Sequence, residues 1–376
     1  MRHVYVHVPF CRRRCVYCDF SIAVRREVPA DTYATALRAE LDVRFRSGVG
    51  FVAPLDTIYL GGGTPSLLTP DALTRVIDDV RDAAGGRLAD DAEVTVEANP
   101  EDVTAESAAA WVVAGVNRVS LGAQSFEASV LHWMHRPHGP DAIPRAVHVL
   151  REAGVASLSL DLIFGIPRAA GPRFGADLER AVALEPDHLS VYGLTVEPHT
   201  PLGRWVTRQT VHPAPEERHA VEFLMAHDAL SAAGFEHYEV SNYARPGRRA
   251  RHNSAYWDLR PYLGLGPAAH SFDGAVRRWN VTPWVAWERA ARSGRDPVEG
   301  EERLTPRQAR LERAYLGLRT SNGAPAADLR WPSPEGDRAL EAGWLEVAGA
   351  LVRATPAGWL RLDSLAQALT TWPGGG

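Results

Sequence analysis

The stretch His7-Val-Pro-Phe-Cys-Arg-Arg-Arg-Cys-Val-Tyr-Cys-Asp-Phe20 decides the fold of this chain. It contains all three cysteines of the sequence, Cys11, Cys15 and Cys18, in the spacing C-x3-C-x2-C. Three thiolates in one short loop can hold a metal ion or a cluster and leave one coordination position open, as catalytic sites do. The spacing differs from the C-x2-C of zinc ribbons and from the four-cysteine runs of ferredoxins.

Two simpler interpretations of the cysteines are buried structural thiols and a zinc site. Structural thiols usually scatter through a fold, whereas these three lie within eight residues. A zinc site needs a fourth ligand such as His7 or His3, but we expect His7 to point into the sheet interior. An iron–sulfur cluster with three thiolates has one iron that an outside molecule can chelate. We therefore favour a cluster.

Composition places the chain among globular proteins and excludes several classes. The 376 residues are 45% hydrophobic and 23% charged, enough for a large core without disulfides, in two or three domains. Clustered cysteines, no signal peptide and no apolar run of about 20 residues predict a cytoplasmic protein without a transmembrane segment. A net charge of −5 gives no support for nucleic-acid binding. All 41 basic residues are Arg, so lysine chemistry is not available.

Predicted strands and helices alternate through the first two hundred residues. Strands are expected at 4–8, 57–60, 93–97, 116–121, 158–164 and 188–194, and helices at 31–45, 70–84, 105–114, 141–153 and 172–184. Six βα-type units predict a parallel sheet with right-handed crossovers. Six are too few for a complete eight-stranded barrel. We expect a partial barrel or a doubly wound sheet, with ligands at the carboxyl ends of the strands.

The alternation ends after about residue 205. A helix is predicted at 216–233, a short strand at 235–240, and an irregular, aromatic-rich stretch at 241–287. Beyond residue 305, a helix at 306–317, a hairpin of 343–348 with 351–358 and a helix at 363–369 predict a small α+β, winged-helix-like module. We divide the chain into a barrel (1–235), a linker region (236–300) and a C-terminal domain (301–376). Residues 373–376 are expected to be disordered.

Polar residues follow the predicted strands at the point where each strand ends. After one strand comes Gly61-Gly-Gly-Thr-Pro-Ser66, whose glycines allow backbone groups to approach a ligand and whose Thr64 adds a hydroxyl. A tight βα turn is the plain alternative, and without a lysine it is no P-loop. Glu97, Gln124 and Asp161 offer acceptors for ribose hydroxyls and a basic amine, although each alone could cap a helix. Arg136 can pair with a carboxylate, or be a solvated loop residue.

These residues together resemble the radical S-adenosylmethionine (SAM) superfamily, whose signature is C-x3-C-x2-C after the first strand. Further motifs look like the oxygen-independent coproporphyrinogen III oxidase family over nearly the whole chain: His7-Val-Pro-Phe-Cys, Tyr59-Leu-Gly-Gly-Gly-Thr-Pro-Ser, Glu97-Ala-Asn-Pro, Ser120-Leu-Gly-Ala-Gln-Ser-Phe, Asp161-Leu-Ile-Phe-Gly and Gly264-Leu-Gly-Pro-Ala-Ala-His-Ser. The resemblance implies a partial (β/α)6 barrel and a [4Fe-4S] cluster whose fourth iron is chelated by SAM. It also implies reductive cleavage of SAM to a 5′-deoxyadenosyl radical.

The resemblance also implies roles for particular residues. Cys11, Cys15 and Cys18 would hold the cluster. The expected SAM contacts are Tyr5, Gly62 (as backbone lining), Gly63, Thr64, Glu97, Gln124, Arg136 and Asp161.

Two departures from the oxidases place the chain in a subgroup. Phe20 stands where the oxidases carry a fourth cysteine, and the sequence begins at the first strand, without their N-terminal extension. Both features resemble the HemW subgroup of haem chaperones, as does His252-Asn-Ser-Ala-Tyr-Trp257, an H-N-x-x-Y-W motif. This implies haem binding and transfer to haem-accepting proteins, including respiratory-chain proteins, with an electron donor for the cluster and a homodimer as further expected partners. The alternative function is oxygen-independent coproporphyrinogen III dehydrogenase.

The physical chemistry of the H-N-x-x-Y-W stretch fits a haem contact. Histidine is a common haem-iron ligand, and Tyr256 and Trp257 can supply a flat apolar wall. Guanidinium groups that precede His252 can pair with propionates, from Arg245, Arg248, Arg249 and Arg251. A solvated arginine loop with a histidine that caps local structure is the plain alternative. His270 is a second candidate haem ligand, or a residue that lines the SAM cavity.

Overall fold

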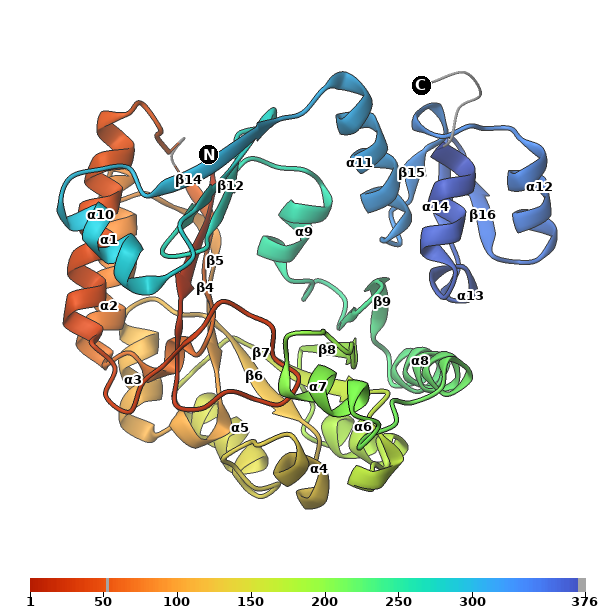
Figure 1. Cartoon of the computed structure of the whole chain (residues 1–376), viewed down its shortest axis with the longest axis horizontal. Coiled ribbons are helices and arrows are strands. Elements are labelled where there is room, and N and C mark those ends of the chain that lie inside the picture. The colour runs from red at the N-terminus through yellow and green to blue at the C-terminus, as the bar shows by residue number, and fades with distance from the viewer. Residues whose placement is uncertain (52–53, 371–376) are drawn as a thin grey trace.

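A computed structural model describes residues 1–51 and 54–370 of the chain. Its main sheet has twelve strands in the order β14-β13-β12-β11-β1-β4-β5-β6-β7-β8-β10-β9 within the described residues (Figure 1). Six neighbouring strands run parallel: β1 (His3–Val8), β4 (Leu55–Gly62), β5 (Leu88–Ala98), β6 (Arg118–Gln124), β7 (Ser157–Phe164) and β8 (His188–Gly193). The sheet curves into a partial barrel and does not close, as the six predicted βα units require.

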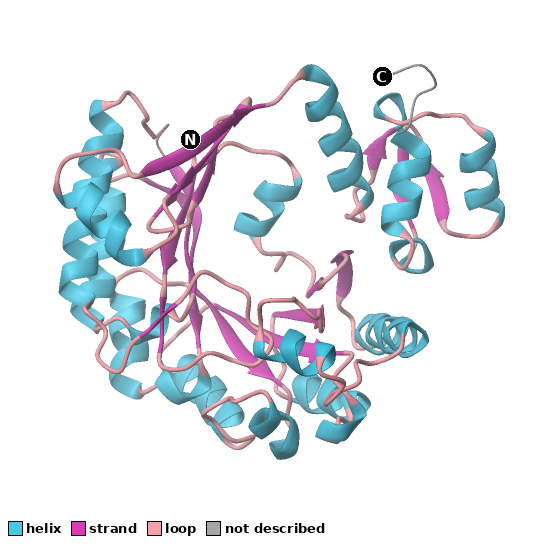
Figure 2. Cartoon of the chain, viewed as in Figure 1, coloured by secondary structure: helices cyan, strands magenta, loops and turns pink. Residues whose placement is uncertain are grey.

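Helices cover the outer face of these strands (Figure 2). They are α1 (Ala30–Arg46), α2 (Pro70–Ala83), α3 (Ala105–Val113), α5 (Ala142–Glu152), α6 (Phe174–Ala183) and α8 (Glu216–Ala232). The short helices α4 (Ala128–Trp133) and α7 (Pro201–Thr207) pack in one cluster beside the cysteine loop, where the Leu202 N–H donates to the Val16 carbonyl at 2.8 Å. The alternation of β1 explains its packing: Val4, Val6 and Val8 are fully buried, while Tyr5 faces the barrel interior. No helix within 1–51 and 54–370 is long and apolar enough to cross a membrane.

The stretch 241–287 is not irregular, and that prediction was wrong. It contains β10 (Asn242–Ala244), α9 (Arg251–Trp257), β11 (Tyr262–Leu265), β12 (His270–Phe272), β13 (Val276–Asn280) and the first turn of α10 (Trp284–Arg292). With β9 (Glu236–Glu239) and β14 (Val298–Arg303), these strands extend both edges of the main sheet. Strands of three to five residues are too short to show a clear alternation. The proposed division at residue 235 therefore falls between two strands of one sheet, β8 and β9, and the division at residue 300 falls inside β14 of the same sheet.

A small α+β region follows the barrel. Its three-stranded sheet has the order β15-β17-β16, from β15 (Ala324–Pro325), β16 (Leu345–Ala348) and β17 (Leu351–Ala354). The helices are α11 (Pro306–Leu318), α12 (Pro334–Glu341), α13 (Pro356–Trp359) and α14 (Leu362–Thr370). Two helices, one on each side of a short strand, followed by a hairpin, agree with the winged-helix-like prediction. The predicted disorder of 373–376 falls outside the described residues.

The helix α9 lies on the concave side of the sheet, inside the barrel (Figure 1). It contacts β4, and its His252 stacks on Tyr59 of that strand, with ring centroids 5.0 Å apart and planes 27° apart. The Glu93 carboxylate of β5 accepts from the backbone N–H groups of Arg251 and His252, each at 3.0 Å. The barrel interior is thereby filled towards the amino ends of the strands, and it is hollow at their carboxyl ends.

Candidate cofactor-binding site

A cavity of about 450 Å³ opens at the carboxyl ends of the parallel strands. Ten of the twelve predicted site residues line it: Cys11, Cys15, Cys18, Gly62, Gly63, Thr64, Glu97, Gln124, Arg136 and Asp161. They come from the cysteine loop, from the strands β4 to β7 or the residues just after them, and, for Arg136, from the loop between α4 and α5. The two remaining residues, Tyr5 and His252, do not line the cavity.

A short parallel pair of strands, β2 (Phe10–Cys11) and β3 (Ala23–Val24), joins the two ends of the cysteine loop, and backbone hydrogen bonds of Val16 with Met134 and Leu202 hold the loop in place. All three thiols are half-buried. Burial raises the pKa of Cys11 to about 11, opposed by the hydroxyl of Thr64 at 3.4 Å from Sγ. Burial also raises the pKa of Cys18, opposed by the backbone N–H of Phe20. The Nη1 of Arg136 lies 3.6 Å from Sγ of Cys15. Each thiol therefore has its own hydrogen-bond partner.

Neither histidine that a zinc site would need is turned towards the cysteines. The His7 ring lies 3.0 Å from the Tyr5 hydroxyl at Nδ1 and 2.9 Å from the carbonyl oxygen of Ser21 at Nε2. The His3 ring binds Thr57 at 3.1 Å. The three thiols without a fourth protein ligand fit a cluster with one open iron.

The glycines after β4 have a packing role that the sequence did not reveal. Gly62 has φ +108°, and a Cβ there would lie 2.6 Å from the His7 ring. A Cβ on Gly63 would lie 2.7 Å from the carbonyl oxygen of Phe10. The missing side chains thus let β4 approach the first strand and the cysteine loop, and both glycines still line the cavity.

Glu97 is the best-supported acceptor in the cavity. The Tyr59 hydroxyl donates to its Oε1 at 2.7 Å, and the Gly62 N–H donates to its Oε2 at 3.0 Å. Burial, together with the nearby carboxylate of Asp161, raises its pKa to about 7 against these two hydrogen bonds, which lower it. A carboxylate held from behind in this way is fixed in orientation, and its remaining lone pairs can accept from a ligand.

Asp161 and Gln124 occupy the neighbouring strand ends. The Ser120 hydroxyl donates to Oδ1 of Asp161 at 2.9 Å, and burial raises the pKa of that carboxyl to about 6. Gln124 ends β6 at a register shift and has φ +65°, which is rare for a residue with a side chain. Strained backbone of this kind persists where the surroundings demand it, and it often occurs at ligand sites.

The hydrogen bonds of Arg136 indicate whether the site can bind SAM. Its Nη2 donates to the Gly122 carbonyl at 2.9 Å and to the Asn99 side chain, and its Nη1 faces Cys15. Its Nε is buried and has no partner within the described residues. A guanidinium group beside the cysteine loop with an unused donor suits the SAM carboxylate, and the carboxylates of Glu97 and Asp161 suit the ribose hydroxyls and the sulfonium charge.

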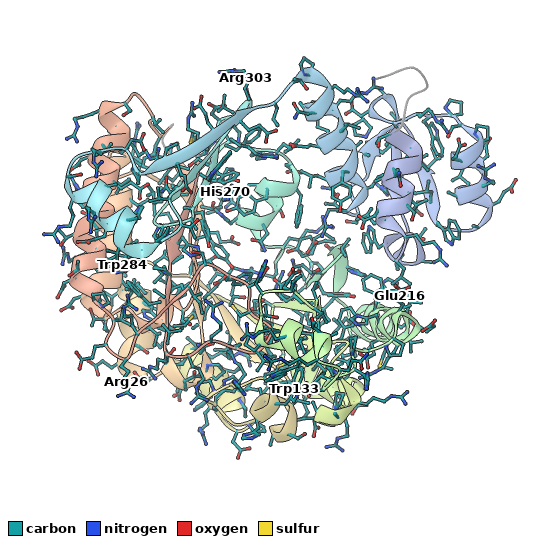
Figure 3. The ribbon with its side chains drawn as sticks, in the orientation of Figure 1. Arg26, Trp133, Glu216, His270, Trp284 and Arg303 are labelled. Atoms are coloured by element: carbon teal, nitrogen blue, oxygen red, sulfur yellow. The ribbon has the colours of Figure 1, made fainter. Side chains whose placement is uncertain are left out.

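The haem candidates lie away from this cavity. His252 is only 1% exposed, and its Nδ1 and Nε2 lie 2.7 Å from the hydroxyls of Thr57 and Tyr256. Burial lowers its pKa to about 3. Tyr5 lies in the same layer, with its ring beside the stacked rings of Tyr59 and His252. His270 is exposed on β12 and stacks on Trp279, and Figure 3 shows it on the side of the sheet that faces α9.

The arginines before His252 already have partners. Ion pairs join Arg248 to Asp187, Arg249 to Glu236 and Arg251 to Asp91. Arg245 binds the Ala233 carbonyl and lies over the Phe235 ring. These contacts fit the plain alternative of a loop that anchors local structure.

Sequence reasoning missed several polar residues of the cavity, among them Asn99, Ser120 and Tyr192. Asn99 accepts from Arg136 and lies 3.5 Å from the Thr64 hydroxyl through its Nδ2. Ser120 orients Asp161, and Tyr192 stands at the end of β8. Asn99 and Tyr192 share one signal that was available in the sequence, since both lie at the end of a predicted strand.

Comparisons with known proteins agree with this geometry. Residues 5–169 match the family model of the radical SAM superfamily. The chain is 38% identical over 371 residues to heme chaperone HemW of Mycobacterium tuberculosis, covering 97% of this chain and 94% of that protein. It is 41% identical over 286 residues to heme chaperone HemW of Escherichia coli, covering 74% and 73% of the two chains. The solved structure of coproporphyrinogen III oxidase (HemN) from Escherichia coli superposes with a TM-score of 0.79 at 22% identity, covering 97% and 88%.

The partial barrel, the C-x3-C-x2-C loop and the cavity beside it define a radical SAM protein. Within that superfamily the chain belongs to the HemW family, because its similarity to those proteins extends over nearly its whole length.

Proposed function

We propose that the chain is a haem chaperone of the HemW type, which binds one [4Fe-4S] cluster, SAM and haem and passes haem to acceptor proteins. One observation carries this proposal: its similarity to proteins named heme chaperone covers almost all of both sequences. The similarity includes the barrel and the C-terminal region. Phe20, at the position of the oxidases' fourth cysteine, favours the chaperone over the enzyme.

In this proposal Cys11, Cys15 and Cys18 hold the cluster, which supplies one-electron chemistry when bound. Arg136 pairs with the SAM carboxylate through its unused Nε–H, and Glu97 accepts from the ribose hydroxyls. Asp161 and Gln124 complete the pocket, with the backbone of Gly62 and Gly63 and the hydroxyl of Thr64 as its wall. Tyr5 contributes from behind, since its ring packs on Tyr59, which orients Glu97.

For haem we propose His252 as the iron ligand, and His270 as the second candidate. Because both ring nitrogens of His252 are hydrogen-bonded, ligation requires one of these contacts to break: movement of α9 away from β4 would free Nδ1 from Thr57, whereas freeing Nε2 requires the side chains of His252 and Tyr256 to separate within α9. Exposed His270 needs no such change. The proposal also includes haem-accepting proteins such as those of the respiratory chain, an electron donor, a homodimer and a cytoplasmic location.

A titration separates the two ligands. Haem is added to the wild type, His252→Ala and His270→Ala, and the Soret band and the stoichiometry are recorded. Loss of the wild-type spectrum in His252→Ala alone supports His252. An unchanged spectrum in that variant excludes it, and loss in His270→Ala alone assigns the ligand to β12.

The alternative, oxygen-independent coproporphyrinogen III dehydrogenase, is tested with the reconstituted protein under anaerobic conditions. We expect no protoporphyrinogen when coproporphyrinogen III, SAM and a reductant are supplied. In the same preparation, haem-loaded protein should transfer haem to an apo-acceptor. Catalytic formation of protoporphyrinogen would overturn the chaperone proposal.

A further inference from the structure

The outer side of the cysteine loop carries a concentration of positive charge that the proposed function does not use. Residues 12–27 contain five arginines and two acidic residues, in a chain whose net charge is −5. Arg12 pairs with Asp102 at 3.4 Å. We define the arginine patch as Arg13, Arg14, Arg25 and Arg26, which are all exposed.

None of the four patch arginines forms an ion pair within the described part of the chain. Arg14 donates to the Cys18 carbonyl at 3.2 Å, and Arg25 donates to the Val24 carbonyl at 2.9 Å. These neutral acceptors leave the charges uncompensated. Unpaired guanidinium groups on a surface attract an acidic partner over a distance of about a Debye length, roughly 10 Å at 0.1 M salt.

Two exposed apolar side chains lie among these arginines. Phe20 is 61% exposed and Val24 is 45% exposed. Phe20 and Arg14 together line a second hollow of about 290 Å³, which Trp284 closes from α10. Figure 3 shows Arg26 and Trp284 on the same side of the molecule. Aromatic and arginine side chains are the residues enriched at the centres of protein–protein interfaces.

The patch is joined to the cysteines by the backbone. Strands β2 and β3 pair in register, so that Cys11 lies opposite Val24, and the Arg25 N–H donates to the Cys11 carbonyl at 2.9 Å. The Phe20 N–H interacts with the Cys18 thiol. A protein docked on the patch would therefore be separated from the cluster ligands by one layer of backbone. A site for haem propionates would instead need the patch arginines to face the cavity; Arg13 lines the cavity, as Phe20 does, but Arg14, Arg25 and Arg26 do not.

We propose that the arginine patch is the docking surface for an acidic protein that carries one electron at a time. The reduced carrier loses one electron and is oxidised, and the oxidised cluster held by the three cysteines gains it. Charge attraction would speed the encounter, and the Phe20 ring would supply the apolar centre of the contact. This inference rests on the proposed cluster, and it is independent of haem.

The experiment uses the full chain with its reconstituted cluster and a reduced flavodoxin of net negative charge as the probe. The patch variant is Arg25→Glu with Arg26→Glu. The matched control is Arg145→Glu with Arg208→Glu, two exposed arginines on α5 and after α7 that also form no ion pair among the described residues. Cluster absorbance before reduction confirms equal loading. Flavodoxin binding is measured by titration, and the second-order rate of cluster bleaching by stopped flow, at 20 mM and 500 mM salt.

At low salt, we expect the patch variant to bind flavodoxin more weakly than the wild type does. Its cluster should be reduced about ten- to a hundred-fold more slowly, and this difference in rate should be much smaller at high salt. The control variant should react with flavodoxin at the wild-type rate. Photoreduction of the patch variant by a small deazaflavin should also proceed at the wild-type rate. A rate equal to wild type at low salt would overturn the proposal. So would a variant that keeps its flavodoxin rate but loses binding to phosphatidylserine vesicles or to haem, since the patch would then serve a membrane or haem. Absence of any cluster in the wild type would instead refute the proposed cofactor.

Discussion

At the residue scale, the polar side chains that line the cavity are oriented by hydrogen bonds to neighbouring protein groups. Tyr59 and Gly62 fix Glu97, Ser120 fixes Asp161, and Asn99 and Gly122 fix Arg136. Groups that are already oriented and dehydrated lose little entropy when a ligand binds. The donors that hold them are therefore as important for affinity as the groups that face the ligand.

Arg136→Lys tests the arginine. Lysine keeps the positive charge but removes the Nε donor and the contact of Nη1 with Cys15. We expect SAM to bind about ten- to a hundred-fold more weakly, since a hydrogen bond to a charged group contributes about 1.5–3 kcal/mol. The midpoint potential of the cluster should fall, because hydrogen bonds to the sulfurs help to set it. The exposed Arg145→Lys is the control. An unchanged SAM affinity would show that Arg136 does not bind the carboxylate.

The pKa of Glu97 predicts how SAM affinity depends on pH. Since burial raises this pKa to about 7, the carboxylate becomes protonated as pH falls from 8 to 6 and loses acceptors for the ribose. Asp161, with a pKa raised to about 6, adds to the loss below pH 6. We expect the dissociation constant of SAM to rise about tenfold between pH 8 and pH 6. Equilibrium dialysis of the anaerobic, reconstituted protein measures it.

Two variants make this pH prediction specific. In Glu97→Gln the affinity should be weak and should vary little between pH 8 and pH 7. In Tyr59→Phe the carboxyl loses a hydrogen bond that lowers its pKa, so the midpoint should move to higher pH. A wild-type profile that is flat from pH 8 to pH 6 would contradict the assignment of Glu97.

At the element scale, the turn after β4 joins the barrel to the cysteine loop. The positive φ of Gly62 and the close approach of His7 leave no room for a side chain at that point. The Gly63 N–H donates to the Val8 carbonyl at 2.8 Å, so the turn also continues the pairing of β4 with β1. A change in this turn should therefore affect both stability and the cavity.

Gly62→Ala should lower the free energy of unfolding by about 2–4 kcal/mol, from left-handed backbone strain and overpacking against His7. Thermal and urea unfolding of the cluster-free protein measure the change. Gly139→Ala is the control, because a Cβ there meets nothing within 4 Å, and it should change stability by less than about 0.5 kcal/mol. Equal stabilities of the two variants would show that the turn and His7 can shift to accommodate a Cβ at position 62 without loss of stability.

At the scale of the whole molecule, one buried cluster joins the first helix to the later strands. Glu40 of α1 is fully buried and accepts from the Gly266 N–H at 2.8 Å, Asn280 at 2.7 Å and the Trp287 indole at 2.8 Å. Arg44 supplies the opposite charge at 3.2 Å. The cluster connects segments more than two hundred residues apart, and it holds the loop between β11 and β12.

Glu40→Ala should destabilise the protein by about 3–5 kcal/mol, because it leaves three buried donors without their acceptor and leaves Arg44 with Asp296 as its one remaining carboxylate partner. Glu40→Gln keeps one acceptor and should cost less. Urea unfolding followed by fluorescence and by far-UV circular dichroism measures both variants. Equal stabilities of the two variants, or a loss of less than about 1 kcal/mol of unfolding free energy in Glu40→Ala, would contradict this role of the buried Glu40 carboxylate.

The sequence by itself determined the βα order, the parallel sheet and ten of the twelve predicted residues that line the cavity, because strand ends in a parallel sheet meet at one rim. Only the tertiary structure decided that β11 to β14 extend the same sheet, since pairing between short, distant strands leaves no local pattern. It also decided that His252 is buried against Tyr59, while His270 is exposed, because burial depends on which segments pack together. The cysteine loop illustrates both cases. Its spacing predicted a cluster, whereas only its folded structure showed that the arginines of the patch are exposed and form no ion pair within the described residues.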